Sequence, residues 1–278
     1  MVLVAHGSRD PRAASATRAL VRAVQAERPD AQVRASFLDH TRPGPGQVLR
    51  ALEAAGHRGA AVVPLLLTAA YHGRVDIPGA ITAARVAGLR MPVAVTDVLG
   101  PVGGVVDELL LAGLRRRLAE TGAVPAETGA VPAETGAVPV DRGAASTGVG
   151  SAPGPVAPAA DGIVLAAAGT RDEAARRTVD EAARALGELL DVPCLAAYAS
   201  AAPPTAGAAV AELRERGARR VAVAAYFLAP GRLYETACAS ARAEGVVAVA
   251  APLGAAPELA RLVLARVAAE PAARYTRT

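Results

Sequence analysis

Two segments of this sequence carry histidines whose side chains can bind a metal ion or move a proton. His6 stands in VLVAHGSRDP and His72 in VVPLLLTAAYHGRVDIPGA, each shortly after an apolar run. Neutral imidazole binds borderline divalent metals, and near neutral pH it also accepts protons. The two segments therefore predict metal-linked or acid–base chemistry, provided that the fold brings them to one cleft.

The second half of the sequence repeats these segments without their histidines. VLAAAGTRDE at 164–173 matches the first segment, but Ala168 replaces His6. The counterpart of the second segment, YFLAPGRLYET, has no histidine either. A duplicated scaffold with the histidine pair in one copy predicts a single working site, in the first half. The alternative is that His6 is a buried polar residue and His72 a solvated loop residue.

Several charged residues near the histidines are further candidates. Asp39 ends the apolar run in SFLDH, where a carboxylate can attract a cation or relay protons. A loop or cap aspartate is the alternative. Arg9 and Arg74 are candidate contacts for an anionic ligand. His40 is a weaker candidate for the same cleft, and we expect Asp76 to cap the helix that follows it.

The composition argues against several classes of protein. The net charge is +4, but the arginines that supply every basic side chain are scattered among acids, and only two Phe and five Tyr are present to stack on bases. The sequence has no GxxxxGK[ST], no GxGxxG after a strand and no GxSxG. Histidine phosphatases carry an arginine directly before the histidine, where this chain has Ala5. We therefore expect no nucleic-acid partner and no nucleotide cofactor.

The cysteines and apolar runs indicate the cellular setting. Cys194 and Cys238 fit no CxxC pattern, so a disulfide framework is not expected. The beginning of the sequence does not read as a signal peptide, and the longest apolar stretch, 60–71, is too short to span a bilayer. These features predict a cytoplasmic protein with no membrane partner.

A low-complexity segment divides the chain into two domains. AETGAVP occurs three times in succession from residue 119, and a Gly/Ala/Pro/Ser-rich run follows. Proline and glycine in every copy exclude a continuous helix. We therefore predict a flexible linker over 119–160, between an N-terminal domain at 1–118 and a C-terminal domain at 161–278.

Apolar runs and amphipathic stretches alternate on both sides of the linker, which is typical of a parallel sheet with helices on its faces. Strands are predicted at 2–6, 31–38, 60–67, 92–98, 162–168, 193–199, 219–227 and 246–250. Helices are predicted at 11–27, 45–55, 75–87, 102–118, 173–190, 204–216, 232–243 and 256–269. Both histidines then follow strands, at the sheet edge where open parallel sheets bind ligands.

The two histidine segments, in this order, resemble the sirohydrochlorin chelatases, which insert metals on the routes to sirohaem and cobalamin. FLD at 37–39 resembles the second-strand segment of that family, where glutamate often replaces Asp39. AAYASAAPPT and AAYFLAPGRL resemble the C-terminal half of its longer members. The resemblance covers nearly the whole chain outside the linker.

This resemblance implies two chelatase-like (Rossmann-like) domains related by a pseudo-twofold duplication, with a tetrapyrrole held in the cleft between them. It implies that His6 and His72 bind the incoming metal and help to remove pyrrole protons, with Asp39 as a third catalytic candidate. Ser8, Arg9 and Arg74 are the expected contacts to the polycarboxylate substrate.

The expected activity is insertion of Fe²⁺ or Co²⁺, as a substrate, into sirohydrochlorin without an organic cofactor. The sequence does not choose between the two metals. The alternative is a tetrapyrrole or metal carrier without turnover. Two fused halves can supply for themselves an interface that a shorter relative forms by dimerising, so we expect a monomer.

Overall fold

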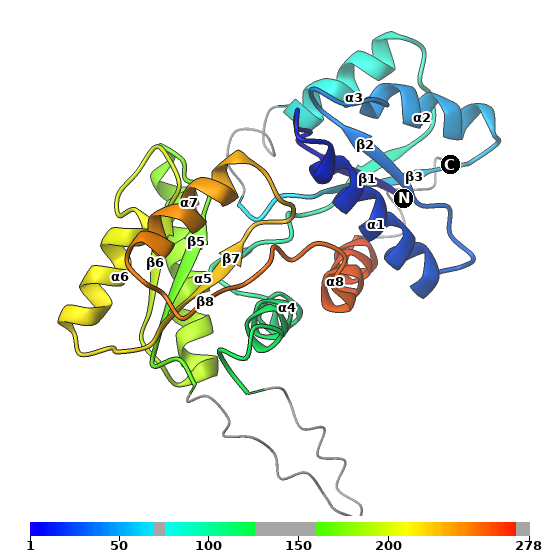
Figure 1. Ribbon diagram of the computed structural model, residues 1–278. Helices are drawn as coiled ribbons and strands as arrows, with labels where there is room; N and C mark the ends of the chain where they lie inside the picture. The colour runs from blue at the N-terminus through cyan, green and yellow to red at the C-terminus, as the bar shows by residue number, and fades with distance from the viewer. Residues whose placement is uncertain (69–75, 126–158, 271–278) are drawn as a thin grey trace, which may run out of the picture.

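A computed structural model describes residues 1–68, 76–125 and 159–270, and these contain two parallel sheets of four strands (Figure 1). We call 1–125 the first half and 159–270 the second half. The first sheet has the order β2-β1-β3-β4 and the second the order β6-β5-β7-β8. The strands are β1 (Val2–Ala5), β2 (Arg34–Phe37), β3 (Ala60–Pro64), β4 (Val93–Val95), β5 (Gly162–Ala167), β6 (Cys194–Tyr198), β7 (Val221–Tyr226) and β8 (Ala248–Val249).

Helices cover both faces of each sheet. They are α1 (Pro11–Glu27), α2 (Pro45–Ala54), α3 (Ile77–Val86), α4 (Glu108–Ala119), α5 (Glu173–Leu190), α6 (Ala206–Glu215), α7 (Arg232–Ala243) and α8 (Pro257–Ala268). The identical strand order and matching element sequence of the two halves confirm the predicted duplicated α/β fold. In the part of the chain described, no helix is long and apolar enough to cross a membrane.

The largest error in the predicted elements is the start of α4, which begins at Glu108 rather than at 102. Val102 and Val105 pair in a tight antiparallel turn, and Gly103 and Gly104 both adopt positive φ. A helix cannot pass through residues in that conformation. Asp107 then starts the helix, because its side chain accepts a hydrogen bond from the Leu109 amide.

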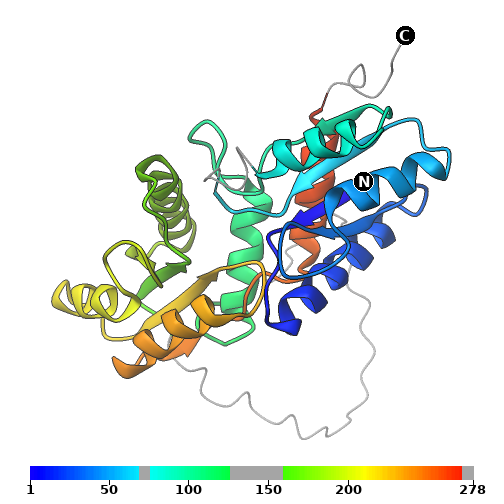
Figure 2. The ribbon, with the colours of Figure 1, turned by 90° about the horizontal axis from the view of Figure 1, so that it is seen from above.

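The two halves exchange their last helices. The helix α4, from the first half, packs on strand β7 and helix α5 of the second half. The helix α8, from the second half, packs on α1 and β3 of the first sheet, and α4 and α8 contact each other between the sheets (Figure 2). The packing therefore crosses the sequence boundary predicted between the domains, and each sheet is completed by a helix from the other half.

One hydrophobic core consequently runs through both halves. Leu110, Leu114 and Leu118 of α4 are buried in the same cluster as Leu259 and Leu262 of α8. Full burial of each such side chain stabilises the folded state by about 1.5–3 kcal/mol. The exchanged helices therefore contribute to the stability of both sheets at once.

Charged side chains at the edge of this core also join the halves. Arg116 on α4 binds the carboxylate of Glu258 on α8, with Nη2 and Oε1 2.6 Å apart. Burial is the largest single influence on the pKa of Glu258 and raises it, but the hydrogen bonds and charge of Arg116, a backbone hydrogen bond and the charge of Arg261 together hold that pKa below its usual value. Arg266 on α8 donates to the Val98 carbonyl at 2.8 Å and to Asp107 at 3.1 Å.

The described ends of the predicted linker lie side by side. The Ala160 amide donates a hydrogen bond of 2.8 Å to the Ala123 carbonyl. Ala123, Val124 and Ala160 are buried in the joint core. The fold therefore fixes the positions where the chain leaves the first half and enters the second.

Deleting residues 126–158 and joining the ends with a short Gly/Ser loop is expected to leave the fold intact. Since the ends already meet, the shorter loop should raise the free energy of unfolding by about 1–2 kcal/mol through its smaller closure entropy. Denaturant unfolding of the deletion variant and the full chain measures this difference. A deletion variant that fails to fold would show that the repeats do more than connect the halves.

Candidate functional site

The loop between β1 and α1 places His6 at the carboxyl end of the first strand. Asp10 ends this loop, and its carboxylate accepts a hydrogen bond from the Arg12 amide at 2.9 Å, which caps α1. The Ser8 hydroxyl oxygen accepts a hydrogen bond from the Asp10 amide at 3.0 Å. His6 is therefore held on a short loop whose backbone is fixed by its own polar side chains.

Gly7 allows this loop to pass close to the end of β2. It adopts a φ of +94°, and a Cβ atom there would lie 1.8 Å from the Asp39 carbonyl oxygen. On the adjoining side, the Asp39 amide donates a hydrogen bond of 2.8 Å to the His6 carbonyl. Only glycine fits between the two chain segments, so it fixes His6 beside Asp39.

The side chain of Asp39 is 61% exposed and faces the neighbouring His40, with Oδ2 and Nε2 3.3 Å apart. His40 adopts a positive φ of 57°, a conformation in which histidine is enriched among non-glycine residues. Neither side chain lines the cleft described below. Asp39 nevertheless adjoins the His6 loop, because its amide binds the His6 carbonyl.

A cleft of about 860 Å³ lies where the carboxyl ends of the two sheets face each other, and His6 lines it. The first half contributes His6 and residues 65–68, and the second half contributes the loop after β5 and the end of β7. A smaller cavity of about 160 Å³ adjoins His6 on the side of α1. Ligand sites in parallel sheets occur at this edge, and the volume suits a ligand the size of a macrocycle.

The predicted site residues divide into three groups. His6 lines the cleft, while Ser8, Arg9 and Asp39 lie on or beside its loop without lining it. His72 and Arg74 fall outside the described residues. Within the described ranges, no group of three or more His, Cys, Asp or Glu side chains is placed to hold a metal.

The capping role predicted for Asp76 is wrong. Asp76 stands directly before α3, but its own backbone is helical. Within the described residues its side chain accepts no hydrogen bond from the first turn of α3. A cap residue normally has extended backbone, which lets its side chain turn back onto the free amides.

An ion-pair network joins the loop of His6 to the second half. Arg12 binds Asp10 with Nη2 and Oδ2 2.6 Å apart, and it also pairs with Glu235 on α7. The hydrogen bonds from Arg12 hold the pKa of the Asp10 carboxyl below its usual value. Because Arg12 and Glu235 are both more than half exposed, this pair contributes little to the stability of the fold.

Sequence reasoning missed the aromatic residues of the cleft. The chain has only five Tyr and two Phe, and Tyr198, Tyr226 and Phe227 all line this cleft. Each stands at or just after the carboxyl end of a strand in the second half. The sequence could have indicated these cleft residues, because three of its seven Tyr and Phe stand at or just after the ends of predicted strands.

The second half reproduces the loop of His6 without its chemistry. Gly169 has a φ of +92°, and a Cβ atom there would lie 1.9 Å from the Ser200 carbonyl oxygen. The Thr170 hydroxyl oxygen accepts the Asp172 amide at 3.1 Å, as Ser8 does for Asp10. Ala168 and Ser200 take the places of His6 and Asp39. The backbone is therefore retained where the reactive side chains are not.

Comparison with known proteins identifies the family. The sequence profile of CbiX matches residues 1–121 and 162–270, nearly everything outside the linker. The chain belongs to the CbiX family. No curated protein matches this CbiX chain in sequence.

Solved structures of other proteins share the fold of this CbiX chain. SirB from Bacillus subtilis with Fe³⁺ is 21% identical, with a TM-score of 0.68 over 96% of this chain and 93% of that one. The sirohydrochlorin chelatase SirB from Bacillus subtilis subspecies spizizenii, in complex with cobalt, is 20% identical, with a TM-score of 0.68 over 96% and 92%. DR2241 from Deinococcus radiodurans, a multi-domain protein with structural similarity to chelatases, is 21% identical, with a TM-score of 0.60 over 96% and 54%. The predicted resemblance is thus confirmed for family and fold.

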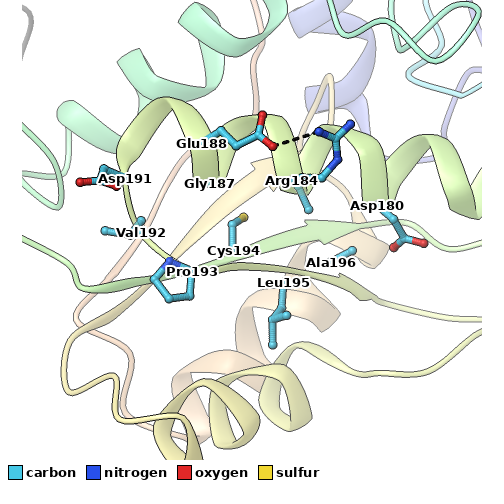
Figure 3. Close-up of a pocket in the computed structure, with 11 residues that line it drawn as sticks. Asp180, Arg184, Gly187, Glu188, Asp191, Val192, Pro193, Cys194, Leu195 and Ala196 are labelled. Atoms are coloured by element: carbon cyan, nitrogen blue, oxygen red, sulfur yellow. Dashed lines mark hydrogen bonds and ion pairs between the residues drawn. The ribbon is translucent and has the colours of Figure 1, made fainter.

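A further depression in this CbiX chain lies away from the cleft, between α5 and the edge strand β6 (Figure 3). Arg184 and Glu188 pair along its rim at 2.9 Å, and the Cys194 side chain points toward α5. Burial raises the pKa of the Cys194 thiol to about 12, so it stays protonated near neutral pH. A protonated thiol is neither a good nucleophile nor a good metal ligand. The depression therefore does not compete with the cleft as a site for the chemistry.

Proposed function

We propose that this chain is a sirohydrochlorin chelatase, which inserts Fe²⁺ or Co²⁺ into sirohydrochlorin. The observation that carries the proposal is the position of His6 on the wall of the cleft between the two halves. Membership of the CbiX family supports it, as does the fold shared with a sirohydrochlorin chelatase that binds cobalt.

The chemistry follows from the charge balance of metal insertion. A divalent ion that enters the macrocycle displaces two protons from pyrrole nitrogens. A neutral imidazole at the cleft wall can hold the ion before transfer or accept one of these protons, and it returns the proton to solvent afterwards. We assign these roles to His6 and, from the sequence, to His72. Asp39 is a third candidate, because it adjoins the His6 loop.

The lining of the cleft suits an amphiphilic macrocycle. Leu65, Leu66 and Leu67 offer apolar surface to a flat ring, and Arg171 supplies a positive charge for a carboxylate. Ser8, Arg9 and Arg74 remain proposed substrate contacts on the first half. We further propose that the chain is a monomer, since α4 and α8 already form the interface between the halves. We also propose that it acts in the cytoplasm and needs no organic cofactor.

The test is anaerobic insertion of Co²⁺ and Fe²⁺ into sirohydrochlorin, followed by absorbance with pigment in large excess over protein. A chelatase gives many equivalents of metallated product for each protein molecule. A carrier stops at one equivalent. If the metallated product forms no faster than it does without protein, while the pigment binds tightly, the chain is a carrier and not an enzyme.

A further inference from the structure

The two copies of the duplicated loop face the cleft differently. In the first half, His6 lines the cleft, while Ser8 and Arg9 of the same loop do not. In the second half, the whole stretch from 167 to 172 lines it, and this stretch includes Arg171. Arg171 is the counterpart of Arg9 in the duplication. The arginine of this loop therefore reaches the cleft wall from the half that has lost the histidines.

The loop of Arg171 is held by a side chain that the loop of His6 lacks. Arg176, in the first turn of α5, donates from Nη1 to the carbonyl oxygens of Thr170 and Arg171, at 3.1 and 3.0 Å. The corresponding residue of the first half is Ala14, whose side chain cannot form such bonds. Because one guanidinium holds two consecutive carbonyls, the backbone that carries Arg171 is ordered before a ligand binds.

The surroundings of Arg171 leave its charge unpaired within the part of the chain that the structure describes. The carboxylate of the adjacent Asp172 accepts hydrogen bonds from the Ala174 and Ala175 amides, at 3.0 and 3.2 Å, and thereby caps α5. A guanidinium binds a carboxylate through two parallel hydrogen bonds, which fix the orientation of the ligand and add affinity. Arg171 can therefore bind a carboxylate that enters the cleft.

The rest of the wall on this side suits the flat body of a macrocycle. Tyr198, Tyr226 and Phe227 line the cleft, together with Leu228 and Leu233. Ligand sites typically combine an apolar lining of this kind with a few polar groups that set the orientation of the ligand. The second half thus offers both an apolar wall and a cation.

We propose that the second half binds and orients the pigment: Arg171 binds a peripheral carboxylate of the tetrapyrrole, and Arg176 is a positioning residue for the loop that carries Arg171. This inference rests on the proposed function and deepens it, because it takes the ligand of the cleft to be a polycarboxylate pigment. It divides the work between the halves, since the histidine chemistry belongs to the first half.

The test compares Arg171→Gln with Arg177→Gln in the full-length protein. Both changes remove one positive charge near the start of α5, but Arg177 is exposed and does not line the cleft. The dissociation constant for metal-free sirohydrochlorin is measured by pigment absorbance at low and at high NaCl concentration. Thermal unfolding shows whether each variant keeps its fold.

Arg171→Gln is expected to weaken pigment binding roughly 10–100-fold, the effect of losing hydrogen bonds between charged groups. It should also make the dissociation constant less sensitive to salt, because salt screens the lost charge pair. Arg177→Gln should leave the affinity unchanged. Arg171→Lys keeps the charge without the paired donors, so its affinity should lie between those of the wild type and Arg171→Gln. Equal affinities in Arg171→Gln and Arg177→Gln would overturn the proposal.

A double-mutant cycle tests the positioning role of Arg176. Arg176→Ala introduces the residue type found at the corresponding position of the first half, Ala14. It should weaken pigment binding in the wild-type background but have no further effect in the Arg171→Gln background, because Arg176 acts through Arg171. An equal loss in both backgrounds would contradict this role, since Arg176 would then act independently of Arg171.

These measurements separate this proposal from the proposed function, because the pigment is metal-free. Wild-type protein that binds sirohydrochlorin but gives no multiple turnover would refute the chelatase activity, and the comparison of Arg171→Gln with Arg177→Gln would still decide how the pigment is bound. Wild-type protein that does not bind sirohydrochlorin would refute both proposals.

Discussion

His6→Ala is expected to reduce metal insertion into sirohydrochlorin by roughly 10²–10⁴-fold, the range typical of a lost acid–base group. The imidazole lies on the cleft wall, and its counterpart in the second half is already alanine, on a loop of the same conformation. The fold therefore tolerates alanine there, and the loss should fall on the chemistry. Initial rates with Co²⁺ and with Fe²⁺ measure it.

His57→Ala is the control for this prediction. His57 is exposed in the turn between α2 and β3 and does not line the cleft. Its replacement should leave the rate of insertion unchanged. If His6→Ala shows near-normal turnover and unfolds like the wild type, His6 has no part in the mechanism, and other residues must bind the metal or accept the protons.

Gly7→Ala is expected to cost more than about 4 kcal/mol of folding stability, the level reached when a substitution forces a severe backbone conflict. The added Cβ would lie 1.8 Å from the Asp39 carbonyl oxygen, and that oxygen belongs to backbone that cannot rotate away. The positive φ adds roughly 1–2 kcal/mol of strain for any L side chain. Since whole domains have stabilities of about 5–15 kcal/mol, the variant should be close to unfolding at 37 °C.

Gly88→Ala separates the two parts of that cost. Gly88 has a φ of +99°, but nothing lies within 4 Å of the position that a Cβ atom would occupy there. Its replacement should cost only the roughly 1–2 kcal/mol of the backbone term. Gly169→Ala, with the same close approach in the second half, should match Gly7→Ala in urea unfolding. Similar losses for Gly88→Ala and Gly7→Ala would mean that the loop can move away from Asp39.

The periodic pattern of the sequence predicted most of the architecture, because each buried strand is a short apolar run and each helix carries one apolar face. The helix α1 begins at Pro11 as expected, since Asp10 caps it and proline suits its first turn. The exchange of α4 and α8 was not predictable in this way. An apolar face shows that a helix is buried, but it does not show against which of two equivalent sheets.

The candidate site shows the same division between local and long-range information. A strand followed by a capped helix places His6 at the carboxyl edge of the sheet, and a cleft is found there. A buried hydrogen bond from the Tyr226 hydroxyl to the Leu67 carbonyl joins residues far apart in the sequence, and it depends on how two sheets meet. The roles of Ser8, Arg9 and Asp39 stay predictions: Ser8 and Arg9 lie on the His6 loop and Asp39 lies beside it, and none of the three lines the cleft.

The exchange of the last helices has a consequence for how such a chain can diverge. In a symmetric pair of identical subunits, every substitution appears in both copies, so a histidine cannot be lost from one and kept in the other. Once the copies are joined in one polypeptide, each position is inherited separately. Because α4 and α8 pack on the opposite sheets, the second copy remains indispensable for folding after its reactive side chains are gone. Mutual dependence of this kind protects a catalytically idle repeat from deletion, and leaves its surface free to acquire contacts that serve the other copy.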